Sequence, residues 1–424
     1  MHQKKIYFCI DLRSFYASCE CVERDLDPTM SDLVVADASR GKGALCLAVS
    51  YHLKEQGVKN RCRLFEIGKD KTYIIARPRM QLYIDYAVRI YKLYQKYFAK
   101  EDIHVYSIDE MFIDVSKYLD LYRMDENNLA LFILRKIKEE TGLVATCGIG
   151  TNLYLAKIAL DIFAKKAEDG ISYLDEEKYV KLLGNHTPLT DFWMIAKGIS
   201  NRLLNKFNVR TMNELQKVDE KLLYDEFGVD AEILIDHAYG KESVTLEDIR
   251  NYTPISNSFS SSQILFRDYD VNEAKIILVE MISELSLRLI KAKQATKTIH
   301  LHIGYANGFP LSSGGSFTMP IISSTFDRLK YYFLDLYERK VIKNRPIRSL
   351  SLSLSNLHPI EDIDMNLIFD FDGANKELRL EQAMNKIKDR FGKNAILRGI
   401  NLLNCATMRE RNKMIGGHAS GEDA

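Results

Sequence analysis

The sequence predicts a multidomain α+β protein. Its 424 residues are enough for two to four domains, since a domain takes roughly 100–200 residues. Hydrophobic residues make up 46% of the chain and charged residues 28%, which is typical of packed globular structure. Strand-like and helix-like segments alternate up to residue 166 and again after residue 270, with only short helical patterns between them. Two such blocks around a helical segment indicate the α+β class.

The first block has the order of a split βαβ unit. Strands are expected at 5–11, 105–115 and 143–150, because these runs are apolar and rich in β-branched or aromatic residues. Amphipathic helices are expected at 127–141 and 152–166. The resulting order, β…β–α–β…α, resembles that of a ferredoxin-like sheet.

Smaller elements fill the interval between the first two of these strands. Runs at 33–37 and 44–51 are further strand candidates. Residues 78–100 predict a helix in which four aromatic residues recur at helical spacing, namely Tyr83, Tyr86, Tyr94 and Tyr97. This spacing favours a buried apolar face over the alternative, a surface on which bases stack.

The C-terminal half predicts a helical segment, a linker and a second α+β unit. Short helices are expected from Tyr179 to Tyr239, and the Ser-, Asn- and Thr-rich run 245–262, which contains Pro254, predicts a linker. The elements expected beyond it are helices at 272–293 and 322–341, strands at 298–305 and 346–355, a Gly-Ser turn at 312–316, an acidic stretch, a final helix at 375–391 and a tail.

Composition points to a reduced, cytoplasmic protein. The seven cysteines form an odd set without a C-x-x-C pair, which argues against a disulfide scaffold or a zinc ribbon. The apolar run before Asp11 is too short for a signal peptide. No stretch approaches the ~18–20 uninterrupted apolar residues of a membrane span. We therefore expect no membrane association.

Charge gives a weaker indication. The net charge of +1 says nothing about partners. Residues 251–360, however, hold 13 basic against 8 acidic side chains, which is a modest indication of a polyanionic partner. A solvated helix face explains the surplus about equally well.

Three carboxylates form the strongest chemical pattern. Asp11 ends the first predicted strand, and Asp109 and Glu110 lie inside the second. Three such groups brought together in one sheet cannot all stay ionised without a counter-charge, so a divalent cation is expected. Oxygen ligands without His or Cys favour Mg²⁺, or Mn²⁺, over zinc. Two ions ~3.5–4 Å apart would suit an in-line phosphoryl transfer.

Four short motifs occur in order along the chain. They are D-L-R-S-F-Y-A-S-C-E at 11–20, S-Y-H-L-K at 50–54, S-I-D-E at 107–110 and L-A-K-I-A at 155–159. Their order and spacing resemble those of the Y-family (translesion) DNA polymerases, and the Ser-rich run 260–269 extends the likeness into the next domain. The resemblance is strongest to the bacterial UV-mutagenesis (UmuC-like) branch.

The resemblance implies a right-hand polymerase with a ferredoxin-like palm, small fingers, a helical thumb and an α+β little finger. The implied boundaries are palm 1–23 and 76–167, fingers 24–75, thumb 168–244, linker 245–254, DNA-binding little finger 255–356 and a C-terminal tail at 357–424.

The resemblance also implies roles for the acidic residues and their neighbours. Asp11, Asp109 and Glu110 would be catalytic and would hold two Mg²⁺ ions, with the Leu12 carbonyl as a candidate backbone ligand. Phe15 and Tyr16 would face the nucleotide. Tyr16 would be a steric gate that fills the space required by a ribose 2′-hydroxyl.

The remaining motif residues would bind the triphosphate of the incoming nucleotide. Tyr51, Lys54 and Lys165 are the candidates, and Lys54 stands where the family has Arg, which makes its grip less specific. The stretch after Ala159 is one residue longer than usual in the family, so Lys166 competes with Lys165 for this role. Lys157 is expected to be a helix-face lysine.

Further candidates lie outside the palm and fingers. Arg345 and Arg348 are candidate DNA phosphate contacts. Residues 364–369 resemble a degenerate sliding-clamp peptide whose anchors would be Leu367 and Phe369, although local packing explains them nearly as well. In the thumb, Met194 and Ala196 replace the glycines of a phosphate-binding hairpin and are expected to resist a positive φ.

The function implied is that of a template-directed DNA polymerase in SOS mutagenesis and DNA repair. It would add dNTPs to a primer 3′-hydroxyl on primer–template DNA, tolerate damaged templates, and act as a monomer with a sliding clamp. Two alternatives stay open. A metal-dependent nucleotidyl cyclase would share the palm but would not require DNA, and a non-catalytic DNA-damage adaptor would keep a vestigial metal site.

Overall fold

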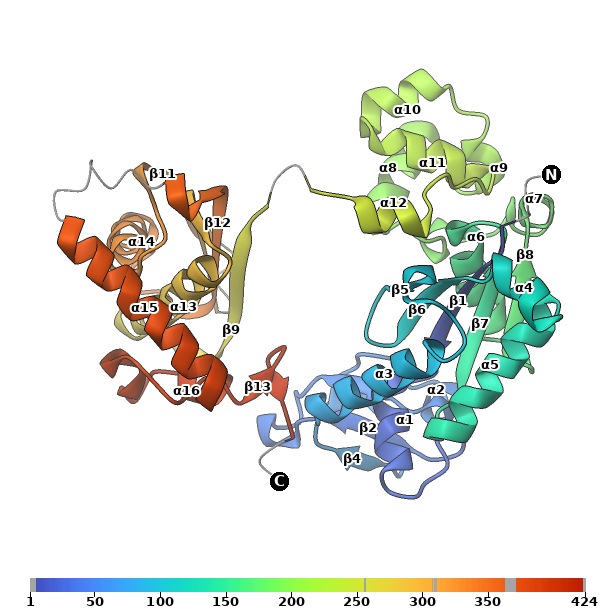
Figure 1. The fold of residues 1–424 in the computed structure, drawn as a ribbon, viewed down its shortest axis with the longest axis horizontal. Coiled ribbons are helices and arrows are strands. Elements are labelled where there is room, and N and C mark those ends of the chain that lie inside the picture. The colour runs from blue at the N-terminus through green and yellow to red at the C-terminus, as the bar shows by residue number, and fades with distance from the viewer. Residues whose placement is uncertain (1–4, 255–256, 307, 309–310, 363–370, 422–424) are drawn as a thin grey trace. The chain divides into compact units, whose positions relative to one another are not determined.

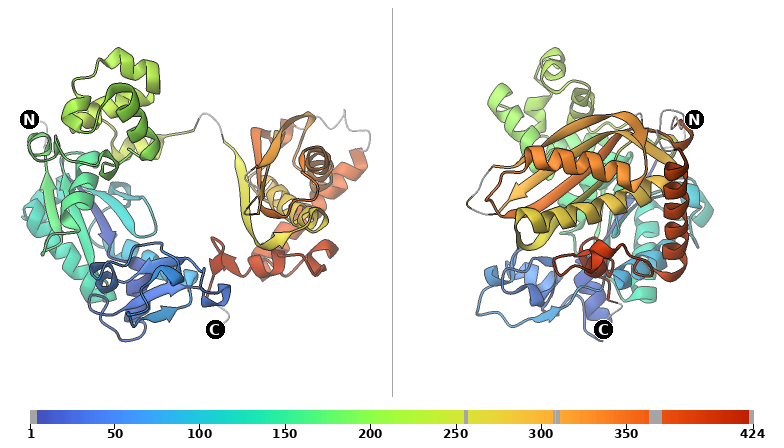
Figure 2. Two further views of the ribbon diagram at one scale, coloured as in Figure 1. Left: turned by 180° about the vertical axis from the view of Figure 1, so that it is seen from behind. Right: turned by 90° about the vertical axis from the view of Figure 1, so that its left-hand side faces the viewer.

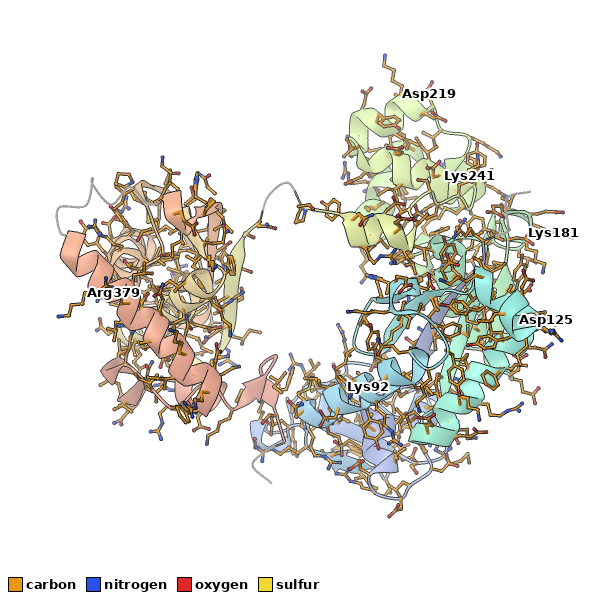
Figure 3. All side chains as sticks on the ribbon, in the orientation of Figure 1. Lys92, Asp125, Lys181, Asp219, Lys241 and Arg379 are labelled. Atoms are coloured by element: carbon orange, nitrogen blue, oxygen red, sulfur yellow. The ribbon has the colours of Figure 1, made fainter. Side chains whose placement is uncertain are left out.

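A computed structural model of the chain describes residues 5–254, 257–306, 308, 311–362 and 371–421. Two compact units are present: Met1–Tyr252 together with His418–Ala424, and Thr253–Gly417 (Figure 1). Charged side chains such as Lys92, Asp125 and Asp219 project from the surface of the first unit (Figure 3). Among the described residues, no helix is both long and apolar enough to span a membrane.

The first unit is built on a five-stranded sheet of order β5-β6-β1-β7-β8. Its strands are β1 (Tyr7–Leu12), β5 (Ile103–Val105), β6 (Glu110–Asp114), β7 (Ala145–Gly150) and β8 (Ile171–Leu174). β1 lies between β6 and β7 and is antiparallel to both. The predicted split βαβ order is confirmed. β8, which was not predicted, extends the sheet beyond residue 167 and runs parallel to β7.

Helices complete this layer. They are α1 (Phe15–Val22), α3 (Met80–Tyr94), α4 (Ser116–Tyr122), α5 (Glu126–Thr141) and α6 (Leu153–Ile158), which continues as a π-helix over Ala159–Ala164. The apolar face of α6 packs on Tyr7, Cys9 and Phe112 of the sheet. On α3, Tyr83, Tyr86 and Tyr94 are buried, so the prediction of a buried aromatic face is confirmed for these three residues.

The strand predicted at 105–115 is wrong in one respect. β5 and β6 form an antiparallel pair joined by a tight turn, in which the amides of Tyr106 and Ser107 both donate to the Glu110 carbonyl at 3.0 Å. The Ser107 hydroxyl donates to the Asp109 carboxylate at 2.7 Å. Short polar side chains that bond locally favour turns, so Asp109 lies in the turn and Glu110 begins β6.

A small three-stranded sheet occupies the interval predicted to hold two strands. Its strands are β2 (Leu33–Ala36), β3 (Cys46–Val49) and β4 (Ile74–Ala76), which lie in the order β3-β2-β4. Helix α2 (Tyr51–Glu55) follows β3 along the chain. Val34, Val49 and Leu53 form its core with Cys46 and Cys62. The predicted second strand therefore ends at residue 49, two residues early, because α2 begins at Tyr51.

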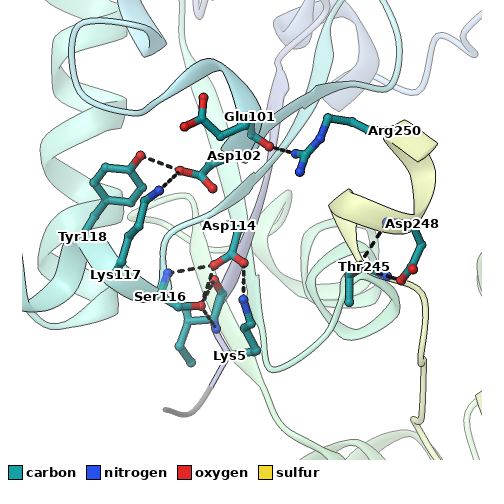
Figure 4. Close-up of polar contacts among 11 residues, drawn as sticks. Lys5, Glu101, Asp102, Asp114, Ser116, Lys117, Tyr118, Thr245, Asp248 and Arg250 are labelled. Carbon is teal, nitrogen blue, oxygen red and sulfur yellow. Dashed lines mark hydrogen bonds and ion pairs between the residues drawn. The ribbon is translucent and has the colours of Figure 1, made fainter. Parts of the chain in front are cut away.

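The helical segment contains α7 (Glu176–Leu183), α8 (Lys197–Phe207), α9 (Met212–Leu215), α10 (Glu220–Phe227), α11 (Asp230–Ala238) and α12 (Leu246–Asn251). Its short helices were predicted, but α12 lies inside the predicted linker. Thr245 and Asp248 cap α12, Leu246 is buried against the first sheet, and Arg250 donates to the Glu101 carbonyl (Figure 4). These contacts order a stretch whose composition suggested a linker.

The second unit is a four-stranded antiparallel sheet of order β11-β10-β12-β9. The strands are β9 (Phe259–Tyr269), β10 (Gln294–Tyr305), β11 (Ser313–Ser323) and β12 (Ile347–Pro359). Helices α13 (Val271–Lys291) and α14 (Phe326–Lys340) lie side by side across one face (Figure 2). Leu350, Leu352 and Leu354 are buried beneath them, while the serines that alternate with these leucines face the other side.

Two predictions fail in this unit. The first residues of β9 were assigned to the linker, and the Gly-Ser run 312–316 was predicted as a turn but lies largely in β11. Gly314 explains the second error. It has φ 142°, and a Cβ there would lie 2.0 Å from the Leu301 carbonyl oxygen, so only glycine allows this close strand pairing.

The C-terminal tail is anchored by buried carboxylates. α15 (Phe371–Phe391) presents the fully buried Glu381, which accepts from Ser286, the Phe326 amide and Arg398. Glu280 of α13 accepts from Asn401 and from Thr407. The short elements α16 (Met408–Arg411), β13 (Met414–Ile415) and β14 (His418–Ala419) end the described chain.

Candidate active site

The acidic residues meet at one end of the first sheet. Asp11 of β1 and Glu110 of β6 are directly opposite in the antiparallel ladder, so their side chains share the face that α6 covers. The Leu12 amide donates to the Asp109 carbonyl at 3.1 Å, which holds the turn carrying Asp109 against the end of β1. The structure thus brings Asp11 together with Asp109 and Glu110, which follow it by about 100 residues in the sequence.

Electrostatics show how crowded this end of the sheet is. Burial raises the pKa of Asp11 to about 6, and the negative charges of Asp109 and Glu110 add to the increase. Lys165 and Lys157 act in the opposite direction. A buried acid beside two others has an excess of negative charge that a bound cation would compensate.

Two lysines and an aspartate of the α6 segment complete the cluster. Lys157 Nζ lies 2.8 Å from Glu110 Oε2 and 2.8 Å from Asp161 Oδ2. Lys165 Nζ lies 2.7 Å from Asp161 Oδ1 and 3.4 Å from Asp11 Oδ2. The expectation for Lys157 was wrong, because it is buried beside the acidic residues and does not lie on a solvated helix face.

The π-helix explains how both lysines reach the site. The Lys165 amide donates to the Leu160 carbonyl, five residues earlier, at 3.2 Å. Such a wide turn accommodates one extra residue within a helix, which agrees with the extra residue expected after Ala159. Lys165 therefore points at Asp11, whereas Lys166 lines a neighbouring pocket with Asp161, Ile162 and Asp191 and makes no described contact with Asp11. The geometry favours Lys165 over Lys166 as a ligand-binding group.

Tyr16 lies beside the acidic end of the sheet on a rigid support. Its ring stacks on that of Tyr83, with centroids 4.4 Å apart and planes inclined by 14°. The Tyr83 hydroxyl donates to the buried Glu20 carboxylate at 2.7 Å, and Arg79 binds the same carboxylate. Burial and the charge of Asp109 raise the pKa of Tyr16. Phe15, the preceding residue, is buried.

Support for Tyr16 was not predicted, although one sequence signal was available. Glu20 ends the first motif, and a fully buried glutamate requires partners, which are Arg79, Tyr83 and Arg24. Arg24 is four residues from Glu20, but Arg79 and Tyr83 are 59 and 63 residues away, so only the structure reveals that they meet it.

Tyr51 and Lys54 approach the site from helix α2. Lys54 Nζ donates to Ser14 Oγ at 2.8 Å, and burial lowers the pKa of Lys54. The Arg13 guanidinium lies 4.9 Å from the centroid of the Tyr51 ring. Arg13 was missed in the sequence, although it stands inside the first motif. The cations Lys54 and Lys165 and the Tyr51 hydroxyl could bind an anionic ligand.

The residues expected to contact DNA or other partners are less closely defined. Arg348 is exposed and lies 3.5 Å from Asp268 in an ion pair, and Arg345 also has a polar or electrostatic partner. Leu367 and Phe369 lie outside the described residues. Within the described chain no group of three or more His, Cys, Asp or Glu side chains has the geometry of a preformed metal site.

The thumb hairpin departs from expectation. Met194 adopts φ 68°, so it takes the left-handed conformation that it was expected to resist. Ala196 has φ −82° and an ordinary extended backbone at the N-cap of α8. Of the two residues that stand in place of glycine, Met194 therefore has a strained backbone and Ala196 does not.

Comparison with known proteins identifies the relatives of this chain. Residues 10–161 match the model of the impB/mucB/samB family, and residues 256–367 match that of its C-terminal domain. UvrX of Bacillus subtilis (strain 168), described as a candidate UV-damage repair protein, is 33% identical over 429 residues that cover 98% of each chain. DNA polymerase IV 2 of the same organism is 30% identical over 441 residues, covering 99% of this chain and 100% of that one.

A solved structure supports the fold. A Y-family DNA polymerase chimera of Dbh and Dpo4 aligns with a TM-score of 0.63 at 23% identity, covering 83% of this chain and 98% of that one. The fold is that of a right-hand DNA polymerase. The chain belongs to the impB/mucB/samB family, the Y family of DNA-directed DNA polymerases that act in translesion synthesis and DNA repair. The predicted fold class and enzyme class are confirmed. Such a polymerase acts on DNA and dNTPs, and the family generally uses divalent metal ions.

Proposed function

We propose that this chain extends a primer 3′-hydroxyl with dNTPs on damaged templates, using the acidic end of the first sheet as its catalytic centre. The convergence of Asp11, Asp109 and Glu110 at one end of the first sheet, with Lys54 and Lys165 beside them, is the observation that supports this site most directly. Tyr51 and the two lysines would hold the triphosphate through charge and hydrogen bonding.

The chemical type of the donor set suits a pair of Mg²⁺ ions, with Mn²⁺ as an alternative, while the described side chains are not arranged as a preformed metal site. It consists of hard carboxylate oxygens, and the pKa of Asp11 is raised to about 6 mainly by burial, with a further increase from the charges of Asp109 and Glu110. Asp11, Asp109 and Glu110 would hold the ions, with the Leu12 carbonyl as an additional ligand. When bound, the ions would acidify the primer hydroxyl and neutralise the charge of the triphosphate and the leaving group.

Sugar selection and partner binding extend the proposal. Tyr16, fixed by its stacking on Tyr83, would exclude a ribose 2′-hydroxyl, and Phe15 would pack behind it. Arg345 and Arg348 would contact primer–template DNA, and Leu367 with Phe369 would anchor a sliding clamp. We place the chain in the UmuC-like branch as a cytoplasmic monomer acting in the SOS response. The UvrX similarity supports a role in UV-damage repair.

The domain boundaries remain part of the proposal: palm 1–23 and 76–167, fingers 24–75, thumb 168–244, linker 245–254 and little finger 255–356. The first sheet, apart from β8, which lies beyond residue 167, would be the palm, the small sheet with α2 the fingers, and the second sheet the little finger.

Primer extension with the purified full chain, dNTPs and Mg²⁺ tests this function. We expect extension by the wild type and its loss in both Asp11→Ala and Asp109→Ala, with DNA binding retained. Lys178→Ala, an exposed lysine of α7, is the control and should extend normally. Cyclic nucleotide formation without DNA would instead indicate a cyclase, and DNA binding without turnover by the wild type would indicate an adaptor.

A further inference from the structure

Lys157 is a charged residue in the centre of the site for which the proposed mechanism has no role. Only 7% of its surface is exposed, and its ammonium group lies between two carboxylates, Glu110 and Asp161, at 2.8 Å from each. The Tyr106 ring covers it, with its centroid 5.9 Å from Nζ. A lysine this deeply buried must be paired, so its partners define what it can do.

The contacts of Glu110 show what Lys157 competes with. Glu110 is 6% exposed, and both of its carboxylate oxygens have partners. The Cys9 thiol donates to Oε1 at 3.1 Å, and Lys157 donates to Oε2 at 2.8 Å. A divalent cation that binds Glu110 must share or displace the ammonium group at Oε2, because the positive charges repel each other.

Asp161 provides an alternative partner for the displaced ammonium group. Asp161 Oδ2 is already 2.8 Å from Lys157, so the lysine can shift its charge toward Asp161 and remain paired. Burial acts to raise the pKa of Asp161, but the nearby ammonium groups of Lys165 and Lys157 lower it by more. The Asp161 carboxylate therefore stays ionised and can accept from Lys157. Lys157 therefore has two carboxylate partners, of which only Glu110 belongs to the proposed metal set.

We infer that Lys157 is a positioning residue that holds Glu110 in place before metal binding and competes with the metal for it. The inference rests on the proposed metal site. Lys157 compensates the charge of Glu110 while no cation is bound and turns to Asp161 when one arrives. Lys157 thereby weakens the affinity of the site for divalent cations while fixing the Glu110 carboxylate in its place beside Cys9.

Mn²⁺ titration followed by electron paramagnetic resonance tests the inference directly, since it measures metal binding without turnover. The full chain is titrated at pH 8.0 without DNA or nucleotide. We expect Lys157→Met, which keeps the length of the side chain but removes its charge, to bind Mn²⁺ at least about fivefold more tightly. Lys157→Arg, which keeps the charge, should stay within about twofold of the wild type. Lys117→Met is the matched control, because Lys117 pairs with a different carboxylate, Asp102, at 2.7 Å.

A second variant tests the same competition in the opposite direction. Asp161→Asn removes one of the two carboxylates that pair with Lys157 among the described residues and leaves Glu110. Lys157 should then hold Glu110 more strongly, so Mn²⁺ binding should weaken at least about fivefold. Circular dichroism confirms folding, and if Lys157→Met does not fold, Lys157→Gln replaces it. If the wild type binds Mn²⁺ and the folded Lys157 and Asp161 variants bind it with the same affinity, the inference about Lys157 is overturned, whereas the proposed metal site stands. No Mn²⁺ binding by the wild type would overturn the proposed metal site as well.

Discussion

Asp11 shows how a residue suited to a metal site can reduce the stability of the metal-free protein. Its pKa is raised to about 6 in the folded state, above its ordinary value of 3.8, so the folded state binds a proton that the unfolded state releases. Ionised Asp11 therefore disfavours folding at neutral pH. This cost disappears as pH falls from about 6 toward 4, where the carboxyl is protonated in the folded state.

Replacing Asp11 with Asn should consequently stabilise the protein in a metal-free buffer. We expect Asp11→Asn to raise the free energy of unfolding at pH 8 by about 3 kcal/mol, since one pKa unit corresponds to about 1.4 kcal/mol and the shift from 3.8 to about 6 already includes the attraction of Lys165. At pH 4 the gain should fall below about 1 kcal/mol. Urea unfolding in EDTA at both pH values measures it. A gain of the same size at pH 4 would contradict the assigned pKa shift.

Tyr16 provides a second prediction at this scale. If its ring is the steric gate, Tyr16→Ala should raise the ratio of ribonucleotide to deoxyribonucleotide insertion by about tenfold or more, because a bulky barrier is removed while hydrogen bonding elsewhere is kept. Single-nucleotide insertion assays with matched rNTP and dNTP measure this ratio. Tyr16→Phe keeps the ring and should retain the wild-type preference. Unchanged sugar selection in Tyr16→Ala would remove Tyr16 from this role.

At the scale of single elements, the structure locates strain in the hairpin before α8. Met194 has φ 68° and its side chain is 49% exposed, so little packing compensates for the left-handed backbone. Met194→Gly should raise the free energy of unfolding by about 0.5–1 kcal/mol, because glycine adopts this conformation without steric cost. Met194→Ala, which keeps the Cβ, is the control and should not stabilise. Denaturant unfolding measures both, and equal effects would show that backbone strain is not the cause.

The elements also show what the sequence could and could not reveal. The long helices α5, α13 and α14 and the apolar strands β1 and β7 were predicted, because their periodicity reflects burial on one face. The turn at Asp109 was not, since alternating apolar residues continue on both sides of it. β11 was misread because Gly314 lies in a strand for steric reasons that depend on Leu301, a residue of the neighbouring strand.

The candidate site was predictable to a similar extent. Local motifs indicated the acidic residues and left Lys165 and Lys166 as alternatives, since each motif keeps its chemical residue types together. The buried roles of Lys157 and Glu20 depend on partners such as Glu110 and Arg79, which are 47 and 59 residues away in the sequence, and no motif spacing specifies those contacts. Family likeness thus indicates which residues meet, whereas their pairing requires coordinates.

At the scale of the whole molecule, the remaining prediction concerns a partner. If residues 364–369 bind a sliding clamp, replacing Leu367 and Phe369 with Ala should reduce clamp capture at least about tenfold, because apolar anchors carry most of the binding energy in short peptides. Basal primer extension without the clamp should stay unchanged. Pull-down with the clamp from the same organism measures capture, with Leu380→Ala, an exposed leucine of α15, as the control. Equal capture by the double variant would exclude this peptide as the anchor.

The π-helix over Ala159–Ala164 has a consequence for how such a chain can vary. The wide turn takes up one additional residue between Lys157 and Lys165. A residue can therefore be gained between the two lysines without moving either ammonium group. Deleting one residue from this turn should restore an ordinary α-helix and leave both lysines facing their carboxylates, whereas a second insertion would rotate Lys165 by about 100°. Alignments that place a gap here should therefore be read as one tolerated change in length, and not as the loss of a binding group.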